Sequence, residues 1–178
     1  MKKYLFYFAL TGWTLGLIVH ILSIADIDVT EKIPFVWLLH IGIFVVWLPV
    51  VLDLKNNEEL KDFQQSGMLN RMNPISFYKI LFKDTPTWMS IIAGAGFFYA
   101  FINFILFMSS QGGTPSIQDG HYVLQNHGEL IKNLTEQEYH QYKANEVRGF
   151  SGHWILFYGV ATAILYKYSG LTKQIGTN

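Results

Sequence analysis

The sequence contains no cysteine among its 178 residues. This absence excludes disulfides, thiolate catalysis, Fe–S clusters and cysteine-ligated zinc. A metal ion bound to this chain would therefore need histidine, aspartate, glutamate or asparagine ligands.

Charged residues are also scarce. They make up 15% of the chain, whereas about a quarter of the residues of an average soluble protein are charged, and 51% of the residues here are hydrophobic. The formal net charge is zero, which indicates neither a nucleic-acid partner nor an acidic ligand. The sequence shows no P-loop, dinucleotide fingerprint, HExxH or GxSxG pattern, which argues against a nucleotide ligand. This composition indicates a protein whose main partner is the lipid bilayer.

Four stretches of the chain lack aspartate, glutamate, lysine and arginine. They are Tyr4 to Ala25, Ile33 to Leu52, Thr85 to Gln118 with its most apolar part at Trp88 to Met108, and Gly149 to Tyr166. Each approaches or exceeds the roughly 18–20 residues that a helix needs to cross about 30 Å of hydrocarbon. We predict four transmembrane helices in a single membrane domain, residues 1–178. A cleaved signal peptide is the alternative for the first stretch, but its apolar run exceeds the usual length of about 7–15 residues.

The positions of lysine and arginine predict the orientation. Nine of the 13 lie at the N-terminus, in the 53–84 connection or near the C-terminus. Because cytoplasmic loops carry an excess of these residues, both termini and the 53–84 connection are predicted to be cytoplasmic. Residues 110–148 then lie outside. The absence of cysteine and the short chain favour a bacterial inner (plasma) membrane, with a eukaryotic endomembrane as the alternative.

The 53–84 connection carries apolar residues among charges at helical spacings, interrupted by Gly67 and Pro74. Such a pattern is typical of amphipathic helices that lie on a membrane surface. We therefore predict short surface helices on the cytoplasmic leaflet.

Residues 110–148 are predicted to form an ordered extracytoplasmic cap. The runs "HYVLQ" and "ELIKNL" flank Asn126-His127-Gly128, a pattern that indicates a short β-hairpin. Thr135 followed by Glu138 is a capping box, so a helix is expected from Glu136 toward Arg148. The predicted fold class is an all-α integral membrane protein with four transmembrane helices, both termini cytoplasmic, plus this cap.

The predicted topology places His20, His40 and His153 in the outer leaflet, with Asn103 at a similar depth. His20 continues a Gly12/Gly16 stripe at a spacing of four, and His153 follows Gly149 at the same spacing. Small residues at this spacing let helices approach closely, and intramembrane ionisable groups usually face the interior of the bundle. We therefore expect the histidines to form an internal polar cluster.

Three roles for this cluster are compatible with the sequence. Neutral histidines that bond to Asn103, Ser23, Tyr158 or backbone carbonyls would specify helix packing, at about 1 kcal/mol per bond. Three converging histidines would suit an open zinc or copper site. Any two of the three histidines would suit a b-type haem.

The functional hypothesis is a binding or accessory subunit with this histidine-rich cluster on its extracytoplasmic side. It would act with a membrane-protein partner or as a homo-oligomer. The alternative is a metal- or haem-dependent membrane enzyme or electron carrier that uses His20, His40 and His153.

Overall fold

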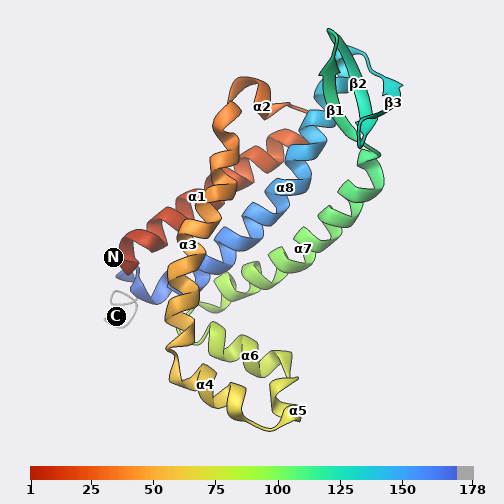
Figure 1. Ribbon diagram of the computed structural model, residues 1–178. Coiled ribbons are helices and arrows are strands. Elements are labelled where there is room, and N and C mark those ends of the chain that lie inside the picture. The colour runs from red at the N-terminus through yellow and green to blue at the C-terminus, as the bar shows by residue number, and fades with distance from the viewer. Residues whose placement is uncertain (172–178) are drawn as a thin grey trace.

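The computed structural model describes residues 1–171 (Figure 1). The chain is mostly helical. The elements in chain order are α1 (Lys2–Ile24), α2 (Val29–Lys32), the 3-10 helix η1 (Pro34–Trp37), α3 (Leu38–Lys55), α4 (Glu58–Gln65), α5 (Met68–Arg71), α6 (Pro74–Leu81), α7 (Thr87–Gln111), β1 (Thr114–Gln118), β2 (His121–Asn126), β3 (Glu129–Asn133), α8 (Glu136–Leu165) and the 3-10 helix η2 (Tyr166–Tyr168).

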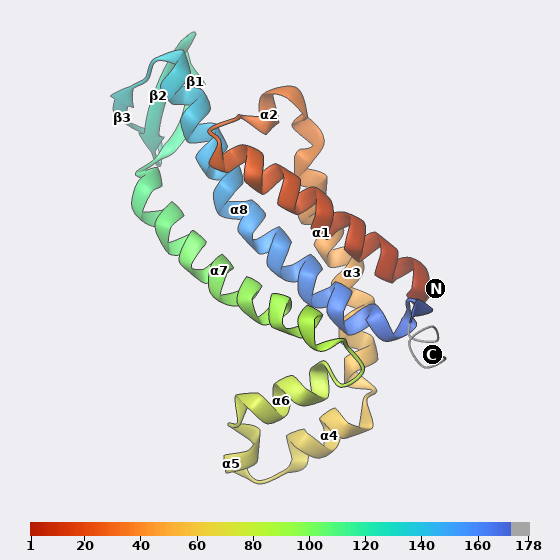
Figure 2. The same ribbon diagram turned by 180° about the vertical axis from the view of Figure 1, so that it is seen from behind.

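The long helices α1, α3 and α7 all pack against α8, which forms the centre of the bundle (Figures 1 and 2). Within residues 1–171, three segments are long and apolar enough to cross a membrane: α1, residues Pro34–Lys55 and α7. Most of the apolar surface of these three segments is exposed. Such exposure is costly in water and favourable in lipid, so the arrangement fits a membrane protein.

The two ends of the bundle carry different elements. The N-terminus, η2 and the helices α4 to α6 lie at one end, and α2 and the sheet lie at the other (Figures 1 and 2). The predicted breaks in the 53–84 connection are confirmed, because Gly67 precedes α5 and Pro74 begins α6. Proline is well suited to that first helical position, since its missing N–H has no intrahelical partner there.

The predicted cap helix and the fourth apolar stretch form one element, α8, which continues through Gly149 without a break. The expectation of two separate elements was therefore wrong. A side chain at either glycine of this region would force a neighbour on α7 to shift: a Cβ on Gly149 would lie 2.5 Å from the ring of Phe107, and one on Gly152 would lie 2.5 Å from Asn103 Nδ2. These glycines bring α7 close to α8 rather than ending a helix.

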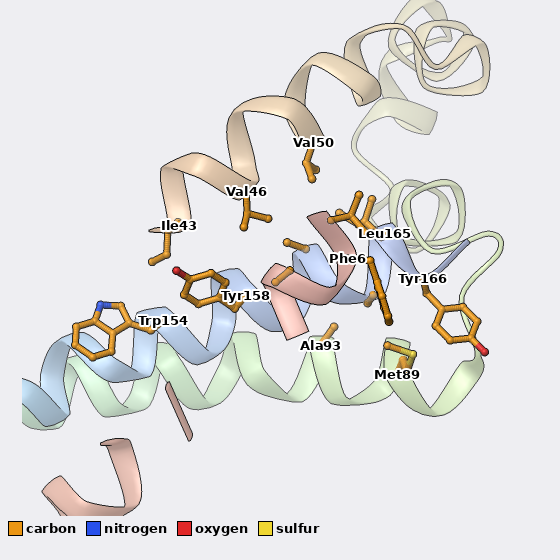
Figure 3. Close-up of a cluster of buried hydrophobic side chains, with 14 of the residues drawn as sticks. Phe6, Ile43, Val46, Val50, Met89, Ala93, Trp154, Tyr158, Leu165 and Tyr166 are labelled. Atoms are coloured by element: carbon orange, nitrogen blue, oxygen red, sulfur yellow. The ribbon is translucent and has the colours of Figure 1, made fainter. Parts of the chain in front are cut away.

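The core lies where α1 and α3 meet α8 (Figure 3). Trp154 and Tyr158 of α8 are fully buried there together with Val46 and Val50 of α3, and Phe6 of α1 fills the end of the cluster near η2. α8 therefore supplies the two largest side chains that are fully buried in the bundle, Trp154 and Tyr158.

The strands form a three-stranded antiparallel sheet in the order β1-β2-β3. The predicted hairpin is confirmed as β2 and β3, and both turn residues, His127 and Gly128, have positive φ. This geometry is typical of a two-residue hairpin turn. The third strand, β1, was not predicted, so the fold is helical with a small sheet rather than all-α. Thr114–Gln118 carries no charge and was grouped with the preceding apolar stretch, but Gly112, at φ 65°, ends α7 before it.

The capping box at the start of α8 is confirmed. Thr135 Oγ accepts a hydrogen bond of 3.2 Å from the backbone N–H of Glu138, and the Glu138 carboxylate accepts one of 2.8 Å from the N–H of Thr135. Lys132 of β3 also pairs with Glu138, at 2.5 Å. Together these bonds lower the pKa of Glu138 to about 2, the pairing with Lys132 contributing most. They fix the sheet to the beginning of α8.

Candidate polar site on α1, α7 and α8

His20 is the most deeply buried of the three predicted site histidines, with 3% of its surface exposed. Its Nδ1 lies 2.7 Å from Ser151 Oγ of α8, and its Nε2 hydrogen-bonds with the hydroxyl of Tyr99 on α7. The Gly12/Gly16 stripe predicted that His20 faces protein, and this is confirmed. One imidazole thus connects three helices.

The partners of Ser151 are compatible with one complete direction for these hydrogen bonds. The Ser151 hydroxyl lies 3.2 Å from the carbonyl of Arg148, to which it can donate. In that arrangement its oxygen accepts from Nδ1–H of His20, and Nε2 accepts from the Tyr99 hydroxyl. The result is a chain from Tyr99 through His20 and Ser151 to a backbone carbonyl, which we call the Tyr99–His20–Ser151 chain.

The Tyr99 end of this chain opens onto a groove of about 420 Å³ between α1 and α7, with α8 contributing the rest of the lining. Its walls are mainly apolar and include Ile21, Ile92, Gly96 and Gly159, while the lining residues with polar side-chain atoms are Trp13, His20 and Tyr99. A volume of this size is within the range of small-molecule sites, which are mostly apolar with a few placed polar groups.

The two other histidines are held elsewhere. His40 Nδ1 accepts a hydrogen bond of 3.2 Å from the indole N–H of Trp154, and His153 Nδ1 lies 3.2 Å from the Gly149 carbonyl, to which it donates. Among residues 1–171 there is no group of three or more histidine, aspartate or glutamate side chains that could hold a metal ion. The structure therefore gives His20, His40 and His153 separate partners and does not bring them together as zinc or copper ligands.

The predicted supporting residues bind backbone rather than imidazoles. Asn103 Nδ2 donates to the Arg148 carbonyl at 2.9 Å, Ser23 donates to the His20 carbonyl at 2.8 Å, and Tyr158 donates to the Leu39 carbonyl at 2.8 Å. The Asn103 and Tyr158 bonds each join two helices, so these side chains specify packing.

Sequence reasoning missed the two partners of His20. Tyr99 lies three residues after Gly96 and four before Asn103, so helical spacing places it on the same face of α7 as these two residues. Ser151 carried no such signal, because serine is common in apolar helices. Its role depends on the close approach of α1 and α8.

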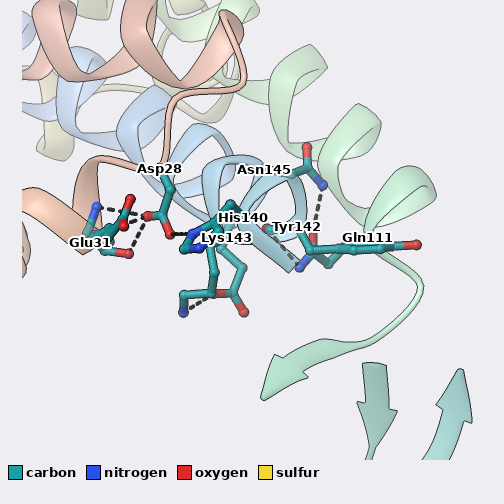
Figure 4. A network of polar contacts seen from close by, with 9 residues as sticks. Asp28, Glu31, Gln111, His140, Tyr142, Lys143 and Asn145 are labelled. Atoms are coloured by element: carbon teal, nitrogen blue, oxygen red, sulfur yellow. Dashed lines mark hydrogen bonds and ion pairs between the residues drawn. The ribbon is translucent and has the colours of Figure 1, made fainter. Parts of the chain in front are cut away.

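A second polar cluster lies at the sheet end of the bundle (Figure 4). Asp28 Oδ1 accepts hydrogen bonds from the backbone N–H groups of Thr30 and Glu31, at 2.9 and 3.3 Å, and thereby caps α2. Asp28 Oδ2 lies 2.9 Å from His140 Nδ1 of α8. Burial alone would raise the pKa of Asp28, but the hydrogen bonds from Thr30, His140 and Glu31 together lower it below its ordinary value.

The same cluster ties α7 to α8. Gln111, the last residue of α7, donates to the Tyr142 carbonyl at 3.5 Å and accepts from Asn145 at 2.5 Å. The α1–α3 connection and the end of α7 are therefore both anchored to the first turns of α8. This supports an ordered cap, as the sequence predicted.

Comparison with known proteins finds no matching family model, no similar curated protein and no similar solved structure. A function for this chain therefore has to be inferred from the geometry of its polar site.

Proposed function

We propose that this chain is an integral membrane protein with four spans, in which α8 supplies the fourth. α8 runs beside three helices that are each suited to cross a membrane, and its apolar part, from Gly149 onward, lies alongside them. Because α1, α3 and α7 shield it from lipid, α8 needs less apolar surface than they do.

The proposed orientation places both termini and α4 to α6 in the cytoplasm and the sheet outside, in a bacterial inner membrane. The lysine and arginine distribution supports this proposal, since most of these residues lie at the α4-to-α6 end. A cysteine introduced at Gln137 should react with an impermeant thiol reagent in intact cells, and one introduced at Asn57 should not. The native chain has no cysteine, so the background is clean. Labelling of Asn57→Cys but not of Gln137→Cys would show that the orientation is the opposite of the one proposed.

The activity that the geometry supports best is binding of a small membrane-soluble molecule in the groove between α1 and α7, as a binding subunit. One observation carries this proposal: the hydrogen-bond chain through the buried His20 ends at Tyr99, whose side chain lines a mainly apolar groove. A hydroxyl placed there offers a specific contact to a polar atom of a ligand that enters from the bilayer. The metal-dependent alternative has no comparable support among residues 1–171, where no suitable ligand group occurs.

Photolabelling tests the groove directly. The probe is a long-chain alcohol that carries a diazirine, added to the protein in lipid nanodiscs. Adducts should concentrate on the groove walls. Gly96→Leu should abolish them, because a side chain at Gly96 would enter the groove, and a Cβ there meets no atom within 4 Å.

Phe98→Leu is the matched control, since Phe98 is on the same helix, is exposed and lies outside the groove. It should leave the groove adducts unchanged. Adducts spread evenly over the exposed face of α7 and insensitive to Gly96→Leu would overturn the proposed binding site.

A further inference from the structure

The Tyr99–His20–Ser151 chain has two self-consistent hydrogen-bond directions, and this property narrows the class of ligand. In the first direction Tyr99 donates to His20 Nε2, so the lone pairs of the Tyr99 oxygen remain to accept a hydrogen bond in the groove. A hydroxyl group of a ligand suits this state.

In the second direction each hydrogen bond of the chain is reversed, so each donor becomes an acceptor. Ser151 donates to His20 Nδ1, Nε2–H donates to the Tyr99 oxygen, and the Tyr99 O–H points to a ligand atom in the groove. The Arg148 carbonyl then loses its bond from Ser151 but keeps the 2.9 Å bond from Asn103, so it is still satisfied. Each polar atom of the chain keeps a partner, and a ligand carbonyl suits this state.

The lining of the groove favours a flat ring as the polar part of the ligand. Gly96 and Ala93 are small, and a Cβ at Gly96 would meet no atom within 4 Å. The indole of Trp13 fills the space over Gly159, where a Cβ would meet its Nε1 at 3.0 Å. A planar ring beside Gly96 would therefore lie next to the aromatic side chains of Trp13 and Tyr99, on which it can stack.

We propose that the groove binds an isoprenoid-type quinone and its quinol, both through the Tyr99 hydroxyl. This inference rests on the proposed function and assigns the chemical class of its ligand. A quinone presents a carbonyl that accepts from Tyr99, and a quinol presents a hydroxyl that donates to it. Because the hydrogen bonds of the Tyr99–His20–Ser151 chain can reverse their direction, the Tyr99 hydroxyl can donate to the quinone and accept from the quinol at the same position. The apolar tail suits the aliphatic walls and the opening toward lipid.

Decylubiquinone, and the same compound reduced to its quinol, are the probes. Binding to the full-length protein in nanodiscs is measured by equilibrium dialysis against protein-free nanodiscs. The two forms should bind with affinities within about threefold of each other. Tyr99→Phe should weaken both by about tenfold, the factor expected from one lost hydrogen bond to a neutral group. Gly96→Leu should abolish binding, and Phe98→Leu should not change it.

The outcomes separate this inference from the proposed function. If decylubiquinone fails to compete with the photoreactive alcohol, but Gly96→Leu still blocks photolabelling, the groove is a binding site for another class and the quinone inference is wrong. If decylubiquinone binds equally to wild type and Tyr99→Phe, only its tail is recognised, which also overturns the inference. If Gly96→Leu changes neither photolabelling nor quinone binding, both proposals fail.

Discussion

Tyr158 lies at the contact of three helices, and its surroundings allow a double-mutant test of the packing. Its ring lies against Gly12 of α1, where a Cβ would meet ring carbons at 2.5 and 2.7 Å. Its hydroxyl lies next to Gly42 of α3 and donates to the Leu39 carbonyl at 2.8 Å. The two glycines thus contact different parts of one side chain.

Alanine at either glycine should therefore destabilise the bundle, but only one of the two effects should depend on the hydroxyl. Overpacking in a fixed core costs about 1–3 kcal/mol, against which alanine gains up to about 1 kcal/mol in helix propensity. Tyr158→Phe should cost about 1 kcal/mol through the lost bond to Leu39. Without the hydroxyl, the nearest atom of this side chain to a Cβ at Gly42 is Cζ, at 3.5 Å, an ordinary contact. Gly42→Ala should then cost nothing further when it is combined with Tyr158→Phe.

The assay is reversible unfolding in mixed detergent micelles, followed by tryptophan fluorescence, for Gly42→Ala, Gly12→Ala, Tyr158→Phe and the two double variants. The Gly42 pair should show a coupling of about 1–2 kcal/mol, whereas Gly12→Ala should add to Tyr158→Phe. Equal costs for Gly42→Ala in both backgrounds would refute the contact with the hydroxyl. Rescue of Gly12→Ala by Tyr158→Phe would refute the assigned ring position.

Two further predictions concern the cap. Thr135→Ala should lower the free energy of unfolding by about 1 kcal/mol, because α8 loses its N-terminal cap. Thr114→Ala, on the edge strand β1, is the control and should have little effect in the same chemical denaturation experiment. Equal effects of the two substitutions would argue against the capping box. The pKa of Asp28 is lowered in the folded protein, so its carboxylate stabilises the fold above about pH 3.8, its ordinary pKa, and this contribution is lost as the pH falls through the folded pKa. Asp28→Asn should therefore lower the melting temperature at pH 7, and its difference from wild type should shrink as the pH falls below about 3.8. A difference that stays constant as the pH is lowered further would contradict the assignment.

Local signals in the sequence predicted the elements that depend on neighbouring residues. The hairpin around Asn126-His127-Gly128 needs positive φ at two adjacent positions, and glycine at the second makes this geometry easy to recognise. The Thr135/Glu138 capping box likewise involves groups three residues apart. The facing of His20 followed from the Gly12/Gly16 stripe, because helical spacing is fixed.

Features that depend on tertiary contacts were not predictable in the same way. Gly149 was predicted to let helices approach closely, but the identity of the approaching neighbour, Phe107 of α7, comes only from the tertiary structure. The common depth of the three histidines predicted one cluster. Depth does not determine, however, toward which neighbouring helix a side chain points: His20 faces α7 and α8, and His40 faces Trp154.

The position of α8 also explains why its hydropathy is lower than that of the other three long helices. A hydropathy scan registers how apolar a segment is, which reflects exposure to lipid more than depth in the membrane. A helix surrounded by three others can carry serine, threonine and tyrosine, provided that each finds a partner, and Ser151, Thr162 and Tyr158 all do. The same enclosure lets α8 supply the Ser151 hydroxyl to His20. Ser151, one of the polar residues that this enclosure permits in α8, is therefore also a part of the polar site.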